Sequence, residues 1–223
     1  MMFNRHVLAD KLMVWTFRNL GKPFFSDSLE TCDFEEHLGA VHFDGPCLST
    51  PGLYEYKVGS LGEDTTLQVR LLHKIEPDAP LLIYTMGGGE APFDYTASRA
   101  FPEFCGVNVV AVEAPYQRSK QQLEAAFAKL NNYMAMLAMT VAMNEAILKA
   151  PIFSNCPQTM IAGTSLGGFI ANRHHLTYNS ADLYLPMVAG TRHGDIFLTT
   201  MKASKPVQRS PSDLTKHLNF EDK

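Results

Sequence analysis

The feature that most constrains the fold of this chain is the pentapeptide Gly163-Thr164-Ser165-Leu166-Gly167. It follows an apolar run at residues 159–162 and precedes a helix-like stretch at residues 166–176. In a G-x-S-x-G turn between a strand and a helix, the serine occupies a sharp, strained bend that lifts its Oγ above the sheet. The two glycines suit this bend because a Cβ at either position would crowd it. The motif predicts that Ser165 is a nucleophile; a glycine-rich turn whose serine only caps the helix is the alternative.

Composition places the chain among ordinary globular proteins. With 223 residues, of which 46% are hydrophobic and 19% charged, it is long enough to bury the core of one α/β domain. The formal charge of −4 comes without a basic stripe, so we expect no nucleic-acid partner. The four cysteines show no CxxC spacing and are interpreted as buried reduced thiols, so we expect no metal and no cofactor: Cys32, Cys47, Cys105 and Cys156.

Targeting and membrane signals are weak. Arg5, Asp10 and Lys11 interrupt the apolar positions near the start, which argues against the core of a signal peptide and favours a cytoplasmic location. The longest uncharged stretch, residues 131–144, is too short to span a bilayer. We therefore expect no membrane span.

The chain divides into a lead-in and a main domain. Residues 4–20 have apolar positions near helical spacing and predict a helix that packs on the main domain. Residues 23–51 lose this period and gather Gly, Pro, Asp and Ser, which predicts a loop-rich connection. We expect residues 1–53 to form the lead-in and residues 54–223 the main domain.

Strands alternate with helices in the main domain. Residues 54–58 and 66–73 alternate between apolar and polar and predict an antiparallel hairpin. Short apolar runs then predict strands buried on both faces, and longer runs predict helices. The buried strands are expected at 81–85, 107–112, 159–162 and 183–188, and the helices at 95–104 and 120–149, with Met134, Met136, Met139 and Met143 filling the core. This order predicts an α/β fold with a mostly parallel sheet.

These landmarks resemble the α/β-hydrolase superfamily over residues 54–190. The hairpin precedes the strand at 81–85, and Gly87-Gly88-Gly89 follows that strand. The serine motif comes after the next strand, at 107–112, and the long helix that follows it. The resemblance implies an α/β-hydrolase fold with helices on both faces of the sheet, and a serine esterase or lipase acting on a small ester-like molecule. It also implies an oxyanion hole made by the N–H groups of Leu166, Gly87 and Gly88, although Met86 replaces the histidine of the HGGG motif.

The acid and base of a catalytic triad are harder to place. The family order is Ser, then Asp or Glu, then His. Asp195 is the candidate acid and His217 the candidate base, whereas His193 is equally compatible with a solvated loop. Two more strands with their crossover helices need about 30 residues each, more than remain after Gly190. We therefore expect the fold to be incomplete at its C-terminus, with the true acid and base beyond Lys223 and the 223-residue chain inactive.

Three functions remain open. The first is hydrolysis of carboxylic esters through an acyl-enzyme on Ser165, with peptidase or acyltransferase selectivity undecided. The second is a non-catalytic α/β-hydrolase-fold protein that binds a ligand or a partner. The third is an enzyme of another class, such as a nucleotide-binding protein, but residues 86–90 lack a phosphate-binding fingerprint.

Overall fold

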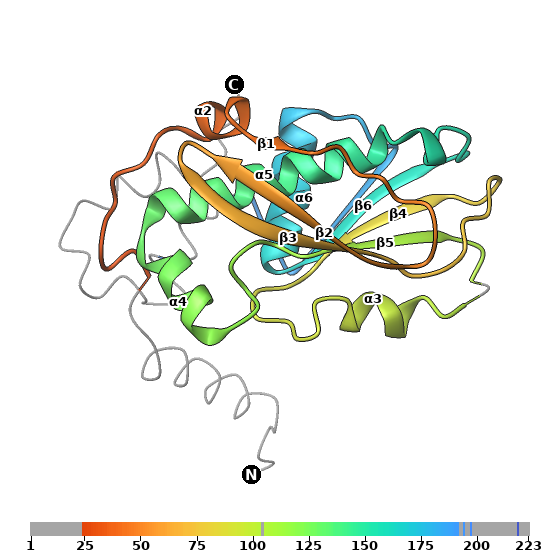
Figure 1. Cartoon of the computed structure of the whole chain (residues 1–223), viewed down its shortest axis with the longest axis horizontal. Helices are drawn as coiled ribbons and strands as arrows, with labels where there is room; N and C mark the ends of the chain where they lie inside the picture. The colour runs from red at the N-terminus through yellow and green to blue at the C-terminus, as the bar shows by residue number, and fades with distance from the viewer. Residues whose placement is uncertain (1–23, 104, 192–193, 195–196, 198–217, 219–223) are drawn as a thin grey trace, which may run out of the picture.

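A mixed sheet of seven strands lies at the centre of the computed structural model, which describes residues 24–103, 105–191, 194, 197 and 218 (Figure 1). The strand order within these residues is β1-β2-β3-β5-β4-β6-β7. The strands are β1 (His42–Phe43), β2 (Gly52–Ser60), β3 (Glu63–Leu71), β4 (Leu81–Thr85), β5 (Asn108–Val112), β6 (Thr159–Thr164) and β7 (Leu183–Met187). The helices are α2 (Phe34–Gly39), α3 (Tyr95–Ala100), α4 (Lys120–Ala128), α5 (Leu130–Leu148), the 3-10 helix η1 (Pro151–Phe153) and α6 (Leu166–Thr177).

The sheet has an antiparallel part and a parallel part. β2 and β3 form the predicted hairpin, joined by a tight turn at Leu61 and Gly62, both of which have positive φ. β3 pairs antiparallel with β5, and from there β5, β4, β6 and β7 are all parallel to their neighbours. The predicted α/β class with a mostly parallel sheet is therefore confirmed.

Helices cover both faces of the central strands, as predicted. Every residue of β4 is buried. Leu81 and Ile83 belong to a cluster with α5, whereas Leu82 and Tyr84 belong to a second cluster with α3 on the opposite face. Because side chains alternate along a strand, burial on both faces requires the continuous apolar run seen in the sequence.

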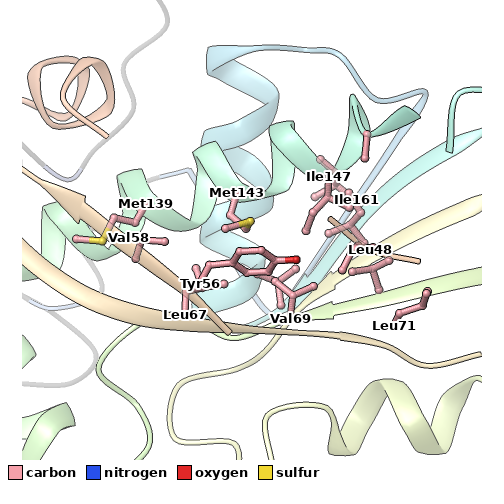
Figure 2. Close-up of a cluster of buried hydrophobic side chains, with 14 of the residues drawn as sticks. Leu48, Tyr56, Val58, Leu67, Val69, Leu71, Met139, Met143, Ile147 and Ile161 are labelled. Carbon is pink, nitrogen blue, oxygen red and sulfur yellow. The ribbon is translucent and has the colours of Figure 1, made fainter. Parts of the chain in front are cut away.

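The larger cluster lies between the sheet and α5 (Figure 2). Met139 and Met143 extend from α5 toward Tyr56 and Val58 on β2. Both methionines are fully buried, as are Met134 and Met136 on the same helix. The methionines therefore fill the core, as predicted.

The helix predicted at residues 120–149 is instead two helices. Lys129 is extended, with φ −120° and ψ 129°, and separates α4 from α5. The lead-in pairs with the chain at this break: Ser28 forms a parallel bridge with Lys129, and the Ser28 carbonyl accepts from Leu130 N–H at 3.0 Å. Nearby, Phe25 N–H donates to the carbonyl of Phe127. Helix propensity alone did not reveal this long-range pairing.

Residues 23–51 contain more regular structure than predicted. They form the helix α2 and the short strand β1, and the Glu36 carboxylate accepts from the N–H of Asp33 just before α2. The prediction that the cysteines are buried was wrong: Cys32 and Cys47 are exposed, and Cys105 and Cys156 are only partly buried. The helix predicted at residues 4–20 lies outside the described residues.

The strand predicted at residues 183–188 exists, but it is not buried. Leu183, Leu185 and Met187 of β7 keep 40%, 41% and 42% of their surface exposed. Among the described residues, β7 pairs with β6 alone, so it forms an edge of the sheet. An apolar run shows that a strand is suited to burial, but it does not show what covers that strand.

Candidate active site

Ser165 lies at the bend between β6 and α6. Its φ of 53° and ψ of −111° are unusual for a residue with a Cβ, and such geometry costs on the order of 1–3 kcal/mol. Its N–H donates to the carbonyl of Met187 on β7 at 2.9 Å, which helps to hold the bend. The residue is exposed, and its hydroxyl does not cap its own helix. The backbone strain and the exposure are those expected of a serine presented to a substrate.

The glycines of the motif allow α6 to pack against two strands. A Cβ on Gly163 would lie 2.3 Å from the carbonyl carbon of Gly167. A Cβ on Gly167 would lie 2.1 Å from the carbonyl oxygen of Thr85, at the end of β4. Both distances are far below van der Waals contact, so only glycine fits. The start of α6 is therefore held close to the end of β4.

This close approach brings the triple glycine next to the serine motif. Residues 87–90 form a turn directly after β4, in which Glu90 N–H donates to the carbonyl of Gly87 at 3.2 Å. A Cβ on Gly88 would lie 3.9 Å from the Cβ of Leu166, the first residue of α6. Two of the predicted oxyanion-hole residues, distant in sequence, therefore lie side by side.

The N–H groups of the turn are not equally free. Gly87 N–H donates to Glu90 Oε2 at 3.1 Å, and Gly89 N–H donates to Gln117 Oε1 at 2.7 Å. Within the described part of the chain, Gly88 N–H has no acceptor. Leu166 N–H opens α6 and has no acceptor inside its helix. The arrangement leaves the Gly88 and Leu166 amides able to bind an oxygen, whereas the Gly87 amide is already engaged.

The surroundings of the Gly88 and Leu166 amides include one feature that stabilises a negative charge and one that opposes it. The N-terminus of α6 carries a partial positive charge from its aligned peptide dipoles. Glu90 brings a carboxylate to the same turn, and Tyr84 Oη lies 3.1 Å from Thr164 Oγ1 and 3.5 Å from Glu90 Oε2. Burial raises the pKa of the Tyr84 hydroxyl above its usual value.

The predicted acid and base of the triad fall outside the part of the chain that the structure describes. Asp195 and His217 both lie there, as does His193. The last residue, Lys223, is outside the described residues as well. Both placements therefore stay predictions: a triad completed by Asp195 and His217, and an acid and base located beyond Lys223.

His174 is a described histidine on the helix that follows Ser165, but it lies away from the bend. It is nine residues after Ser165 on α6, about 13 Å along the helix. There it is fully buried, with Nε2 3.2 Å from Glu145 Oε2. His174 therefore belongs to the core at the far end of the helix.

Sequence reasoning missed the contacts of Glu90 and Gln117 with the turn. Glu90 follows Gly87 by three residues, a spacing at which a carboxylate can reach back to a turn amide, so a local signal existed. Gln117 is 28 residues from Gly89, and no local pattern predicts that contact. In the described ranges, no group of three or more His, Cys, Asp or Glu side chains could hold a metal ion. No helix among those residues is long and apolar enough to cross a membrane.

Comparison with solved structures decides the fold. An acetyl xylan esterase from Paenibacillus sp. R4 superposes with a TM-score of 0.52 at 12% identity, covering 92% of this chain and 77% of that one. The chain has the α/β-hydrolase fold. A thermostable carboxyl esterase from Bacillus coagulans gives a TM-score of 0.49 at 17% identity and covers 75% of this chain. This α/β-hydrolase-fold chain spans 56% of the length of the Bacillus coagulans esterase.

Comparison of sequences does not assign the chain to any family within the α/β-hydrolase fold. No protein-family model matches the chain, and no curated protein is significantly similar to it in sequence. The roles of individual residues therefore depend on the geometry described above.

Proposed function

We propose that this α/β-hydrolase-fold chain belongs to a serine hydrolase that acts on carboxylic esters through an acyl-enzyme on Ser165. One observation carries the proposal: an exposed serine in strained backbone geometry lies next to the unengaged amides of Gly88 and Leu166. The name of the structural neighbour from Paenibacillus, an acetyl xylan esterase, agrees with ester hydrolysis.

In the proposed reaction, Ser165 Oγ attacks the ester carbonyl carbon while a histidine accepts the hydroxyl proton. The carbonyl oxygen becomes an oxyanion and accepts hydrogen bonds from Gly88 N–H and Leu166 N–H. The tetrahedral intermediate then collapses, and the leaving alcohol takes the proton from the histidine. Water, activated in the same way, cleaves the acyl-enzyme. His217 is the candidate base and Asp195 its candidate acid, as the sequence suggested.

The two amides supply most of the transition-state stabilisation in this scheme. Removing one oxyanion-hole donor costs about 10²–10³-fold in kcat in serine hydrolases. These amides are fixed by α6 and by the turn after β4, so little reorganisation is needed when charge develops.

The test is covalent labelling of Ser165. Purified protein is treated with a fluorophosphonate probe, and its hydrolysis of a short-chain nitrophenyl ester is measured. Ser165→Ala is compared with Ser154→Ala, which changes another exposed serine, located between η1 and β6 and so at the end of β6 opposite Ser165. We expect the wild type and Ser154→Ala to label and hydrolyse, and Ser165→Ala to do neither. Hydrolysis by Ser165→Ala at the wild-type rate would refute the proposal.

A non-catalytic ligand-binding protein is the second candidate. It is favoured by the free amides at the bend, because Gly88 N–H and Leu166 N–H can bind a ligand oxygen without a catalytic base. A folded protein that neither labels nor hydrolyses esters would support this candidate. The cytoplasmic location, the lack of a nucleic-acid partner and the division at residue 53 stay predictions.

A further inference from the structure

The turn at residues 87–90 is held by two side chains that the proposed reaction does not itself require. Its first amide is bound by Glu90 and its third by Gln117, so that only the middle amide, Gly88 N–H, is left for a substrate. A glycine turn has many accessible conformations, because glycine populates positive and negative φ about equally. Gly89 is in fact held at φ +76°. Contacts that remove this freedom also fix the direction of the Gly88 amide.

Glu90 uses both carboxylate oxygens. Oε2 accepts from Gly87 N–H at 3.1 Å, while Oε1 accepts from Thr96 N–H at 2.8 Å, in the first turn of α3. The side chain therefore ties the turn to the helix that follows it. A carboxylate can accept at both oxygens, whereas a carboxamide presents one oxygen and one NH₂ group. Glutamine at this position would face one of the two amides with a donor and release it.

Gln117 holds the turn from the other side. It follows β5 and is 7% exposed, and its Oε1 accepts from Gly89 N–H at 2.7 Å. Its Nε2 lies 3.9 Å from the Sδ of Met136, a fully buried residue of α5. This side chain therefore connects the turn to a buried helix on the opposite face of the sheet from α3.

We propose that Glu90 and Gln117 are positioning residues that fix the turn after β4 and aim Gly88 N–H at the substrate oxygen. The inference rests on the proposed function, because an aimed amide has a catalytic purpose only if Ser165 forms an acyl-enzyme. Neither side chain touches the reacting atoms.

Two opposing effects of Glu90 decide the expected result. Its negative charge repels a nearby oxyanion, but Glu90 is partly exposed and both its carboxylate oxygens accept from amides, so the repulsion is screened; at the bulk-water limit of about 1 kcal/mol it changes a rate by a factor of about five. Losing an oxyanion donor changes the rate by about 10²–10³-fold. The loss of positioning is therefore the larger effect, and Glu90→Gln should slow the reaction even though it removes the charge.

The experiment compares Glu90→Gln with Asp94→Asn. Asp94 is a carboxylate four residues further on that accepts from Ser98 Oγ and pairs with Arg70 at 2.9 Å, but contacts none of the turn amides. Ester hydrolysis is measured at a temperature where all variants are folded. We expect Glu90→Gln to lower kcat by about 10–100-fold with KM within about twofold, because the lost interaction is made only in the transition state. Asp94→Asn should keep the wild-type kcat.

Amide hydrogen exchange in protein labelled with 15N-glycine provides a readout that is independent of catalysis. In the wild type, Gly87 and Gly89 should exchange slowly and Gly88 rapidly; in Glu90→Ala, which can accept from neither Gly87 N–H nor Thr96 N–H, Gly87 should exchange faster. An active wild type together with an unchanged kcat in Glu90→Gln would overturn this inference alone. A wild type without activity that depends on Ser165 would overturn the proposed function and the catalytic purpose of the turn with it.

Discussion

Gly167→Ala tests whether α6 must pack directly on the end of β4. The new Cβ would lie 2.1 Å from the carbonyl oxygen of Thr85 and 2.7 Å from that of Met86. Both atoms are backbone oxygens of buried residues at the end of β4 and directly after it, so they cannot rotate away, and α6 must shift by about 1 Å to restore contact distance. A shift of this size in a catalytic group costs about 10²-fold in rate. Overpacking of this kind costs about 1–3 kcal/mol of stability.

The assay for Gly167→Ala combines thermal unfolding with fluorophosphonate labelling of Ser165. For a chain of this size, a loss of 1–3 kcal/mol lowers the melting temperature by roughly 2–12 °C. Gly39→Ala is the matched control, because a Cβ there meets nothing within 4 Å at the end of α2. We expect that control to leave labelling unchanged and to keep or slightly raise the melting temperature. Wild-type melting and labelling in Gly167→Ala would refute the packing argument.

Three further predictions concern stability, each measured by chemical denaturation. Val188→Gly should raise the free energy of unfolding by about 1 kcal/mol. Val188 has a φ of 55° and is 82% exposed, so glycine relieves backbone strain there and little buried surface is lost. A variant less stable than the wild type would contradict this prediction. Phe25→Ala should lower the free energy of unfolding by about 3–5 kcal/mol, because the Phe25 ring is 3% exposed and its centroid lies 5.6 Å from that of Tyr133. A loss below about 1 kcal/mol would show that the lead-in is not part of the core. Burial lowers the pKa of His174 from 6.5 to about 4, so the unfolded chain binds the proton of this histidine more strongly than the folded chain does. The free energy of unfolding should therefore fall as the pH drops from 6.5 toward 4, and it should fall less steeply in His174→Gln. Equal slopes in the two proteins would contradict the lowered pKa of His174.

The central strands could be predicted from the sequence because burial on both faces demands a continuous apolar run. β4 was predicted at its observed bounds, and β6 was predicted to within two residues. The break at Lys129 could not be predicted, since it occurs where the backbone pairs with Ser28, far earlier in the sequence. The exposure of β7 could not be predicted either, because covering a strand depends on its neighbours rather than on its own residues.

The candidate site was predicted only where its chemistry is local in sequence. The bend at Ser165 and the glycines around it impose a short-range steric requirement that leaves a recognisable pattern. The engagement of Gly87 N–H by Glu90, and of Gly89 N–H by Gln117, depends on side-chain directions in the folded chain. The sequence therefore located the glycine turn and the serine bend, while the structure distinguishes among the amides of that turn.

The central claim is that Ser165 and the amides of Gly88 and Leu166 form one reaction centre. A crystal structure of the protein after reaction with a fluorophosphonate tests it most directly. We expect phosphorus bonded to Ser165 Oγ, with the phosphonyl oxygen about 2.7–3.1 Å from both amide nitrogens. A probe attached to another residue, or a phosphonyl oxygen directed away from both amides, would contradict the account.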